Sequence, residues 1–209
     1  MKAFSILLLT ILLLGCEKQH ESTDQCQTKP TIEKGNRLIA VLPTDSGMHG
    51  LWDAESFGHI CSARAWEKEF LQNSSIERNI EQGIFVPINV YSDGAPSIEL
   101  RTGTKQTPAD VLPEEKQWIK ASSKPYLFNS KGSVTVSGIE YIGGLADDSA
   151  RTLELSAGKW SVVVHYLEAD EAERSEDDLY PPDFLLIINP ENNPLEYRKS
   201  VHTFDKPIW

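Results

Sequence analysis

Short segments with strand-like patterning recur along the second half of the chain, and they constrain its fold more than any other feature. Residues 151–155 and 160–166 alternate apolar with polar side chains, and residues 183–188 are nearly all apolar. Turns rich in Gly, Asn and Pro separate such segments at intervals of roughly 8 to 15 residues, which is typical of all-β domains and not of βαβ units. The sequence therefore predicts a mainly β fold, an antiparallel β-sandwich.

The first half of the domain contributes further strands and an expected hairpin. Residues 84–91 and 97–101 have strand character, and Asp93-Gly94 between them is a strong hairpin-turn signal. Pro87 lies within the first of these segments and indicates an edge strand or a bulge, because proline cannot donate to a sheet ladder. The other expected strands are residues 37–42, 125–128 and 133–139.

One or two short helices are expected near the N-terminus of the domain. Residues 62–71 place Ala63, Trp66, Phe70 and Leu71 on one helical face. A second helix is expected over residues 76–81, ending at Gly83. Residues 112–118 have the pattern of a short helix start. The predicted core is Leu38, Val41, Trp66, Phe70, Val90, Ile98, Leu100, Val134, Val136, Leu153, Leu155, Val162, Val164, Phe184 and Leu186.

The chain begins with a segment unlike the rest. Lys2 precedes twelve residues of which only Ser5 and Thr10 are polar, and the run closes on Leu14-Gly15-Cys16. Such a run has the length of the apolar region of a signal peptide and is too short to span a membrane as a helix. The sequence thus divides into a signal peptide at 1–15, a polar tether at 16–36 and a β-rich domain at 37–209.

The ending Leu13-Leu14-Gly15-Cys16 resembles the lipobox of bacterial lipoproteins. That resemblance implies cleavage before Cys16 and attachment of a diacylglycerol to its thiol, so the membrane is reached through lipid. Glu17 follows the cysteine, where an aspartate would favour retention in the inner membrane. We therefore expect an outer-membrane lipoprotein facing the periplasm.

The two remaining cysteines, Cys26 and Cys61, suit a disulfide in an oxidising envelope. Closing that loop would stabilise the fold by about 3–4 kcal/mol in the chain-entropy model. The alternative is two free thiols.

The formal net charge of −11 at pH 7 narrows the choice of partners. A strongly acidic chain does not bind phosphate backbones by releasing counterions, so no nucleic-acid partner is expected. The charge suits either a basic protein partner, such as a toxin, or a surface whose acidity only maintains solubility.

The densest negative charge lies between two expected strands, in residues 168–178, here called the acidic loop. Its order of residues lacks the Asp-x-Asp-x-Asp-Gly pattern of a calcium loop. It is either a solvated connection or a docking surface for a basic partner. The candidate docking residues are Glu168, Asp170, Glu171, Glu173, Glu176, Asp177 and Asp178.

No catalytic signature such as G-x-S-x-G, H-E-x-x-H, a Walker loop or C-x-x-C is present. Asp45, Ser46 and His49 could serve a hydrolase, and His49 with His59 and Cys61 could bind a metal, but their spacing is typical of neither. The sequence therefore predicts a protein that is not an enzyme, with no catalytic residues, metal or cofactor.

Tryptophans offer an alternative function, since exposed indole rings stack on sugars. Trp66 and Trp160 fall in the apolar phase of their segments, whereas Trp52, Trp118 and Trp209 could be exposed. The alternative to a binding or inhibitor protein is thus a structural or glycan-binding envelope lipoprotein.

Several motifs between residues 81 and 188 resemble those of small bacterial inhibitors. They are Gln82-Gly83-x-Phe85, Lys124-Pro125-Tyr126, the run 132–136, and the run 153–160 followed by a strand. The layout is similar to that of the competence nuclease inhibitor and of β-sandwich immunity proteins of toxin systems. The resemblance implies a periplasmic immunity protein that neutralises a toxin or nuclease.

Cys16→Ser tests the anchoring. Because serine cannot form the thioether, the variant should remain an unprocessed precursor or a soluble form, and partitioning into detergent measures the difference. Recovery of the variant in the detergent phase at mature size would contradict the lipobox interpretation.

Overall fold

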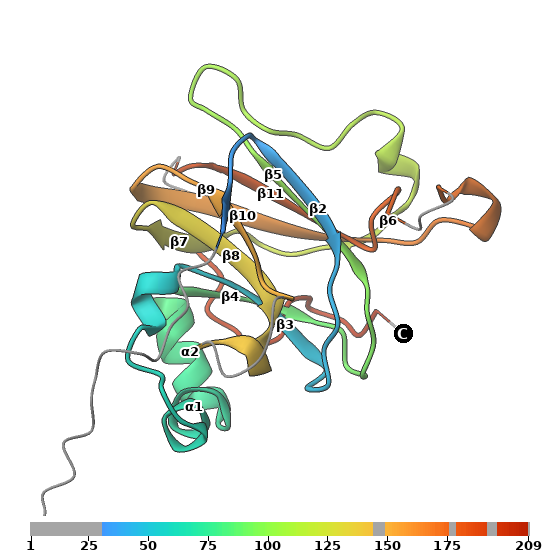
Figure 1. The fold of residues 1–209 in the computed structure, drawn as a ribbon. Coiled ribbons are helices and arrows are strands. Elements are labelled where there is room, and N and C mark those ends of the chain that lie inside the picture. The colour runs from blue at the N-terminus through green and yellow to red at the C-terminus, as the bar shows by residue number, and fades with distance from the viewer. Residues whose placement is uncertain (1–30, 144–148, 176–178, 192–195, 209) are drawn as a thin grey trace, which may run out of the picture.

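Two β-sheets and two short α-helices make up the described part of the chain (Figure 1). The computed structural model describes residues 31–143, 149–175, 179–191 and 196–208, and the structural statements below concern these residues. The first sheet has the strand order β1 (Ile32–Glu33), β9 (Arg151–Glu154), β8 (Ser133–Gly138), β3 (Met48–Trp52) and β4 (Phe85–Asn89). The second has the order β2 (Arg37–Val41), β5 (Ser97–Thr102), β11 (Phe184–Pro190), β10 (Gly158–Leu167) and β6 (Ile119–Ser122), and β7 (Tyr126–Ser130) also pairs with β10.

The mainly β prediction is confirmed, but the prediction of purely antiparallel sheets is wrong. β1 runs parallel to β9 in the first sheet, and β5 runs parallel to β11 in the second. Parallel neighbours need a long crossover between them. Most of the chain between residues 102 and 184 supplies that crossover for β5 and β11. β1 also extends the first sheet into the range 16–36, where we expect a tether.

Five connections between consecutive strands pass from one sheet to the other, and three of them are turns that the sequence predicts. The expected hairpin of residues 84–101 is wrong, because β4 pairs with β3 whereas β5 pairs with β2 and β11. The turn after β7 leads to β8, and the turn after β9 leads to β10, again with a change of sheet. A turn signal shows where the chain reverses, and burial against the shared core then decides which strand becomes the neighbour.

The two sheets share one hydrophobic core. Thirteen of the fifteen predicted core side chains are buried in it, Trp66 is half-buried at its border, and Val41 is wrong because its side chain lies on the open side of β2 with 45 % exposed. Pro87 lies in β4, which ends the first sheet, so the edge-strand interpretation of this proline is confirmed.

The predicted helices are present as α1 (Ala63–Phe70) and α2 (Asn73–Glu81). The Ser62 hydroxyl accepts the Ala65 N–H at 3.2 Å and so caps α1. Phe70 of α1 packs against Phe85 of β4 with ring centroids 5.3 Å apart, and Trp66 donates from Nε1 to the Ile139 carbonyl at 2.7 Å. The helices thus sit on one side of the first sheet (Figure 1). No helix in the described ranges is both long and apolar enough to span a membrane.

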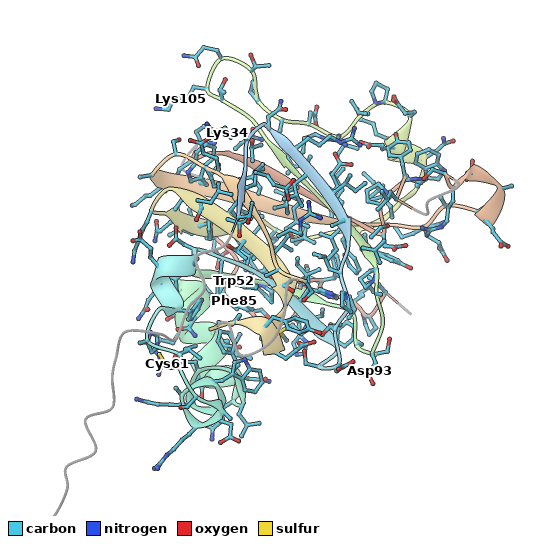
Figure 2. All side chains as sticks on the ribbon, viewed as in Figure 1. Lys34, Trp52, Cys61, Phe85, Asp93 and Lys105 are labelled. Atoms are coloured by element: carbon cyan, nitrogen blue, oxygen red, sulfur yellow. The ribbon has the colours of Figure 1, made fainter. Side chains whose placement is uncertain are left out.

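The contact between the helix layer and the first sheet depends on Gly50 in β3. A Cβ on Gly50 would lie 2.2 Å from a ring carbon of Phe85, so alanine fits only if that ring moves. Figure 2 shows Phe85 beside Trp52 at this face.

Gly50→Ala should therefore lower the free energy of unfolding by about 1–3 kcal/mol through overpacking. Combining it with Phe85→Leu should cost less than the sum of the two changes, because the smaller side chain makes room. Gly94→Ala is the matched control, since its added Cβ meets nothing within 4 Å. Urea unfolding of the four variants measures this, and a Gly50→Ala protein as stable as the control would contradict the packing argument.

Candidate functional site

The acidic loop connects β10 to β11, as the sequence predicts, and its first half has a defined shape. Residues 171–173 form the 3-10 turn η4 (Glu171–Glu173). The Asp170 N–H donates to the Glu173 carboxylate at 3.2 Å, and the Glu173 N–H donates to the Asp170 carbonyl at 2.8 Å. Asp170 and Glu173 therefore hold the turn together. Glu176, Asp177 and Asp178 lie outside the described residues.

Trp118 joins the acidic loop to the body of the protein. Its Nε1 donates to the Glu173 carboxylate at 2.8 Å, and its carbonyl accepts the Glu168 N–H at 2.9 Å. The indole also meets the Tyr180 ring edge to face, with centroids 6.1 Å apart. These contacts fix the loop where it projects beyond the sheet beside β6 (Figure 1).

Few cations neutralise the described acids of the loop. Glu168 lies 3.5 Å from Lys120, but both side chains are more than half exposed, so the pair contributes little. Arg174 bonds to Asp183 at 2.7 Å, at the start of β11, and not to an acid of the loop. Glu171 is exposed and takes part in none of the ion pairs found in the described chain. The described part of the loop is therefore negatively charged, and its backbone is fixed by hydrogen bonds.

A buried ionic cluster lies on the outer face of the second sheet, under the segment that ends at Trp118. Glu99 of β5 accepts from Arg37 at 2.8 Å and from Arg101 at 2.6 Å. Arg101 also donates to both oxygens of Glu115, each at 2.9 Å, and Glu115 accepts the Leu112 N–H at 2.7 Å. Glu99 and Glu115 have no exposed surface. The cluster fastens residues 103–118, here called the covering segment, to the sheet.

Arg101 and Glu115 keep their charges at neutral pH. Burial alone would raise the pKa of Glu115, but the hydrogen bonds from Arg101 and from the Leu112 N–H outweigh it, so the pKa falls below its usual value. The hydrogen bond to Glu115, and after it the bonds to Glu99, raise the pKa of Arg101. The covering segment is thus held by ionised groups at neutral pH, and also by apolar contact of Val111 and Trp118 with Leu185 and Ile187.

The structure does not assemble the residues considered for hydrolysis or metal binding. The Ser46 hydroxyl donates to Glu140 at 2.7 Å, whereas His49 is buried and bonds through Nε2 to the Leu42 carbonyl at 2.8 Å. Burial lowers the pKa of His49, so its ring is neutral at pH 7. His59 lies apart, 3.8 Å from Glu69. Within the described ranges, no group of three or more His, Cys, Asp or Glu side chains is placed to hold a metal ion.

Of the three tryptophans considered as a sugar platform, the structure describes Trp52 and Trp118. The sequence leaves Trp52 as a candidate for exposure, but it is buried at 4 % exposure. Trp118 is half-buried, and its N–H is bonded to Glu173. Trp209 lies outside the described residues. Cys61 precedes α1, and its expected disulfide partner Cys26 and the lipidation site Cys16 both lie outside them as well, so these two expectations stay predictions.

Sequence reasoning missed the residues that hold the acidic loop in place. Arg101, Glu115 and Trp118 lie far from the loop in sequence, and only Glu99 and Arg101, charged at alternate positions of a strand, gave a local signal. Two charged side chains on the same face of a strand indicate that this face points away from the core. They do not show that a later segment of the chain covers that face.

No protein-family model matches the chain, and no curated protein is significantly similar to it in sequence. Among solved structures, the chain is similar to one described as "Crocagin biosynthetic gene J", with a TM-score of 0.50 and 16 % identity over 75 % of this chain and 97 % of that one. It is also similar to ComJ from Bacillus subtilis, described as an inhibitor of the DNA-degrading activity of NucA, with a TM-score of 0.43 and 10 % identity over 77 % and 99 % of the two chains. At 16 % identity, the first likeness shows a shared fold.

Glu115→Gln tests the cluster that supports the site. The amide keeps the shape but leaves Arg101 buried with a weaker partner, so the free energy of unfolding at pH 7 should fall by about 3 kcal/mol. Because folding lowers the pKa of Glu115, its charge stabilises the fold above the unfolded pKa, and this contribution is lost as the pH falls through the folded pKa.

The stability gap between wild type and Glu115→Gln should therefore narrow below the ordinary carboxyl pKa of 4.5. Urea unfolding at pH 7, 5 and about 4 measures the gap, and exposed Glu114→Gln is the control. A gap that is absent at pH 7, or that stays constant with pH, would contradict the assignment.

Proposed function

We propose that this protein is a membrane-anchored binding lipoprotein of the bacterial envelope that inhibits a basic protein partner, a toxin or nuclease, as an immunity protein. The observation that carries the proposal is the described part of the acidic loop, where Trp118 and η4 fix residues 168–173 while Glu168 and Glu171 stay exposed. A held loop loses little conformational entropy on binding, so its charges act at full strength.

The arrangement suits inhibition by occupation of a surface. The negative loop attracts a basic partner within the Debye length, about 8–10 Å at physiological salt, and so increases the rate of association. Trp118 and Tyr180 lie just behind the charges and offer aromatic area of the kind that is enriched at interface centres. Blocking a toxin's basic cleft needs no chemical step from the inhibitor.

The proposal also includes lipid attachment in the cell envelope, a disulfide and a sandwich architecture. Lipid on Cys16 would hold the domain at the outer membrane facing the periplasm, and a Cys26–Cys61 bridge would tie the start of the chain to the region before α1. The two sheets with their shared core support a sandwich architecture.

The proposal predicts protection of the cell that makes the protein. In mixed culture, parental cells should reduce the survival of a strain that lacks the gene, because that strain cannot neutralise the toxin they deliver. The wild-type gene should restore survival. Equal survival of the deletion strain, under conditions where the parent kills an unrelated competitor, would contradict an immunity function.

Charge-neutral variants of the loop extend the same test to mechanism. Glu168→Gln with Glu171→Gln should slow association with the neutralised toxin several-fold, on the order of tenfold at low salt, and leave dissociation nearly unchanged. Glu67→Gln with Glu77→Gln, exposed on the helices, is the matched control. Asp170 and Glu173 are left intact because they shape the turn. Association rates equal to the control at two ionic strengths would remove the loop from the interface.

A further inference from the structure

β2 is an open edge of the second sheet. The Leu42 N–H donates to the Pro96 carbonyl at 3.1 Å and the Thr102 N–H to the Asn36 carbonyl at 2.8 Å, so the even-numbered residues of this strand bond to β5. Hydrogen-bonded and non-bonded pairs alternate in an antiparallel ladder. The N–H and C=O groups of Arg37, Ile39 and Val41 therefore point away from β5, and within the described chain no backbone partner meets them.

The other sheet edges are protected, each by a different device. β1 is two residues long, and β6 is four residues long beside an irregularity in its pairing. β7 has its Asn129 N–H bonded to the Gly83 carbonyl at 2.7 Å. β4 carries Pro87 and is covered by Thr203, whose hydroxyl accepts the Asn89 N–H at 2.9 Å. β2 has five residues and no such cover among the described residues, and Val41 on it is 45 % exposed. Long unprotected edges readily pair with another strand.

The charges along this edge change sign from one end to the other. Exposed Lys34 and Arg37 lie at its start, whereas exposed Asp45 follows its end. The Thr44 N–H bonds to the Gly94 carbonyl at 2.8 Å, which brings Asp93 to the same end. Figure 2 shows Lys34 and Asp93 at opposite ends of β2. An identical strand running the opposite way would place each basic end against an acidic end.

We infer that a second copy of this chain pairs with the first along β2, antiparallel about a two-fold axis at Ile39. In this register Arg37 faces Val41 of the second copy, and all three outward-facing residues find partners. A register shifted toward the C-terminal end would bring in Pro43, which has no N–H to offer. A strand from a basic protein fits less well, because it would meet Lys34 and Arg37.

The pairing leaves the acidic loop accessible. β2 and β6 end the second sheet at opposite sides, and the acidic loop leaves β10 beside β6. A dimer through β2 therefore presents two acidic loops on its outer sides, and the dimer does not depend on the proposed inhibitor function.

Opposite charges placed at Val41 test the register. Val41→Glu puts a carboxylate opposite Arg37 of the second copy and should tighten the dimer by about two- to tenfold, and Val41→Lys should weaken it by a similar factor. Sedimentation equilibrium of the full-length lipoprotein in density-matched detergent gives the dissociation constants. Thermal unfolding of each variant in the same detergent checks the fold. Equal weakening by both charges, or a wild-type monomer at all concentrations, would overturn the proposal.

Val41→Pro tests the backbone pairing itself. Proline removes the outward N–H of Val41 and leaves the bonds to β5, so the fold should persist while the dimer weakens at least tenfold. Val41→Thr keeps the N–H and should dimerise as wild type does. A dimer that survives Val41→Pro unchanged would show that another surface forms it.

Discussion

The bonding of one guanidinium to two buried carboxylates supports the arrangement on which the candidate site depends. Arg101 lies between Glu99 on its own strand and Glu115 on the covering segment, with donor–acceptor distances of 2.6 to 2.9 Å. Removing either acid would leave a desolvated cation with half its partners, which is far more costly than never having buried the charges. Arg37 supplies the second cation, so the cluster contains two basic and two acidic side chains.

A chain of side-chain contacts connects this cluster to the acidic loop. Glu115 fixes the covering segment, the segment ends at Trp118, and Trp118 bonds to Glu173 of the acidic loop. The loop acids therefore divide into two kinds. The Glu173 carboxylate accepts from the Asp170 N–H and from Trp118, whereas Glu168 and Glu171 are exposed and available to a partner. A uniform run of acids in the sequence hides this division, because it depends on an indole more than fifty residues away in the chain.

The sequence predicts which residues are buried better than it predicts which strands are neighbours. Alternation assigns Ile98 and Leu100 to the core because side chains on a strand alternate between its two faces. The same alternation says nothing about the strand alongside, so Asp93-Gly94 suggested a hairpin where the chain changes sheets. Val41 was misassigned for a related reason: its phase differs from that of Leu38 and Ala40 on the same strand, and residue type alone does not give the phase. Long-range polar contacts such as Arg101 with Glu115 have no local signature.

The net charge of the chain and the local charges along β2 have different effects on pairing between two copies. A chain of charge −11 repels its own copies, and this repulsion opposes uncontrolled edge-to-edge association. At physiological salt, charges separated by more than about 8–10 Å are largely screened from one another, so the charges next to a backbone contact have the greatest effect on it. Along β2 those charges are Lys34 and Arg37 at one end and Asp45 and Asp93 at the other. The overall acidity therefore opposes random aggregation, while the local sign change selects one antiparallel register of two copies.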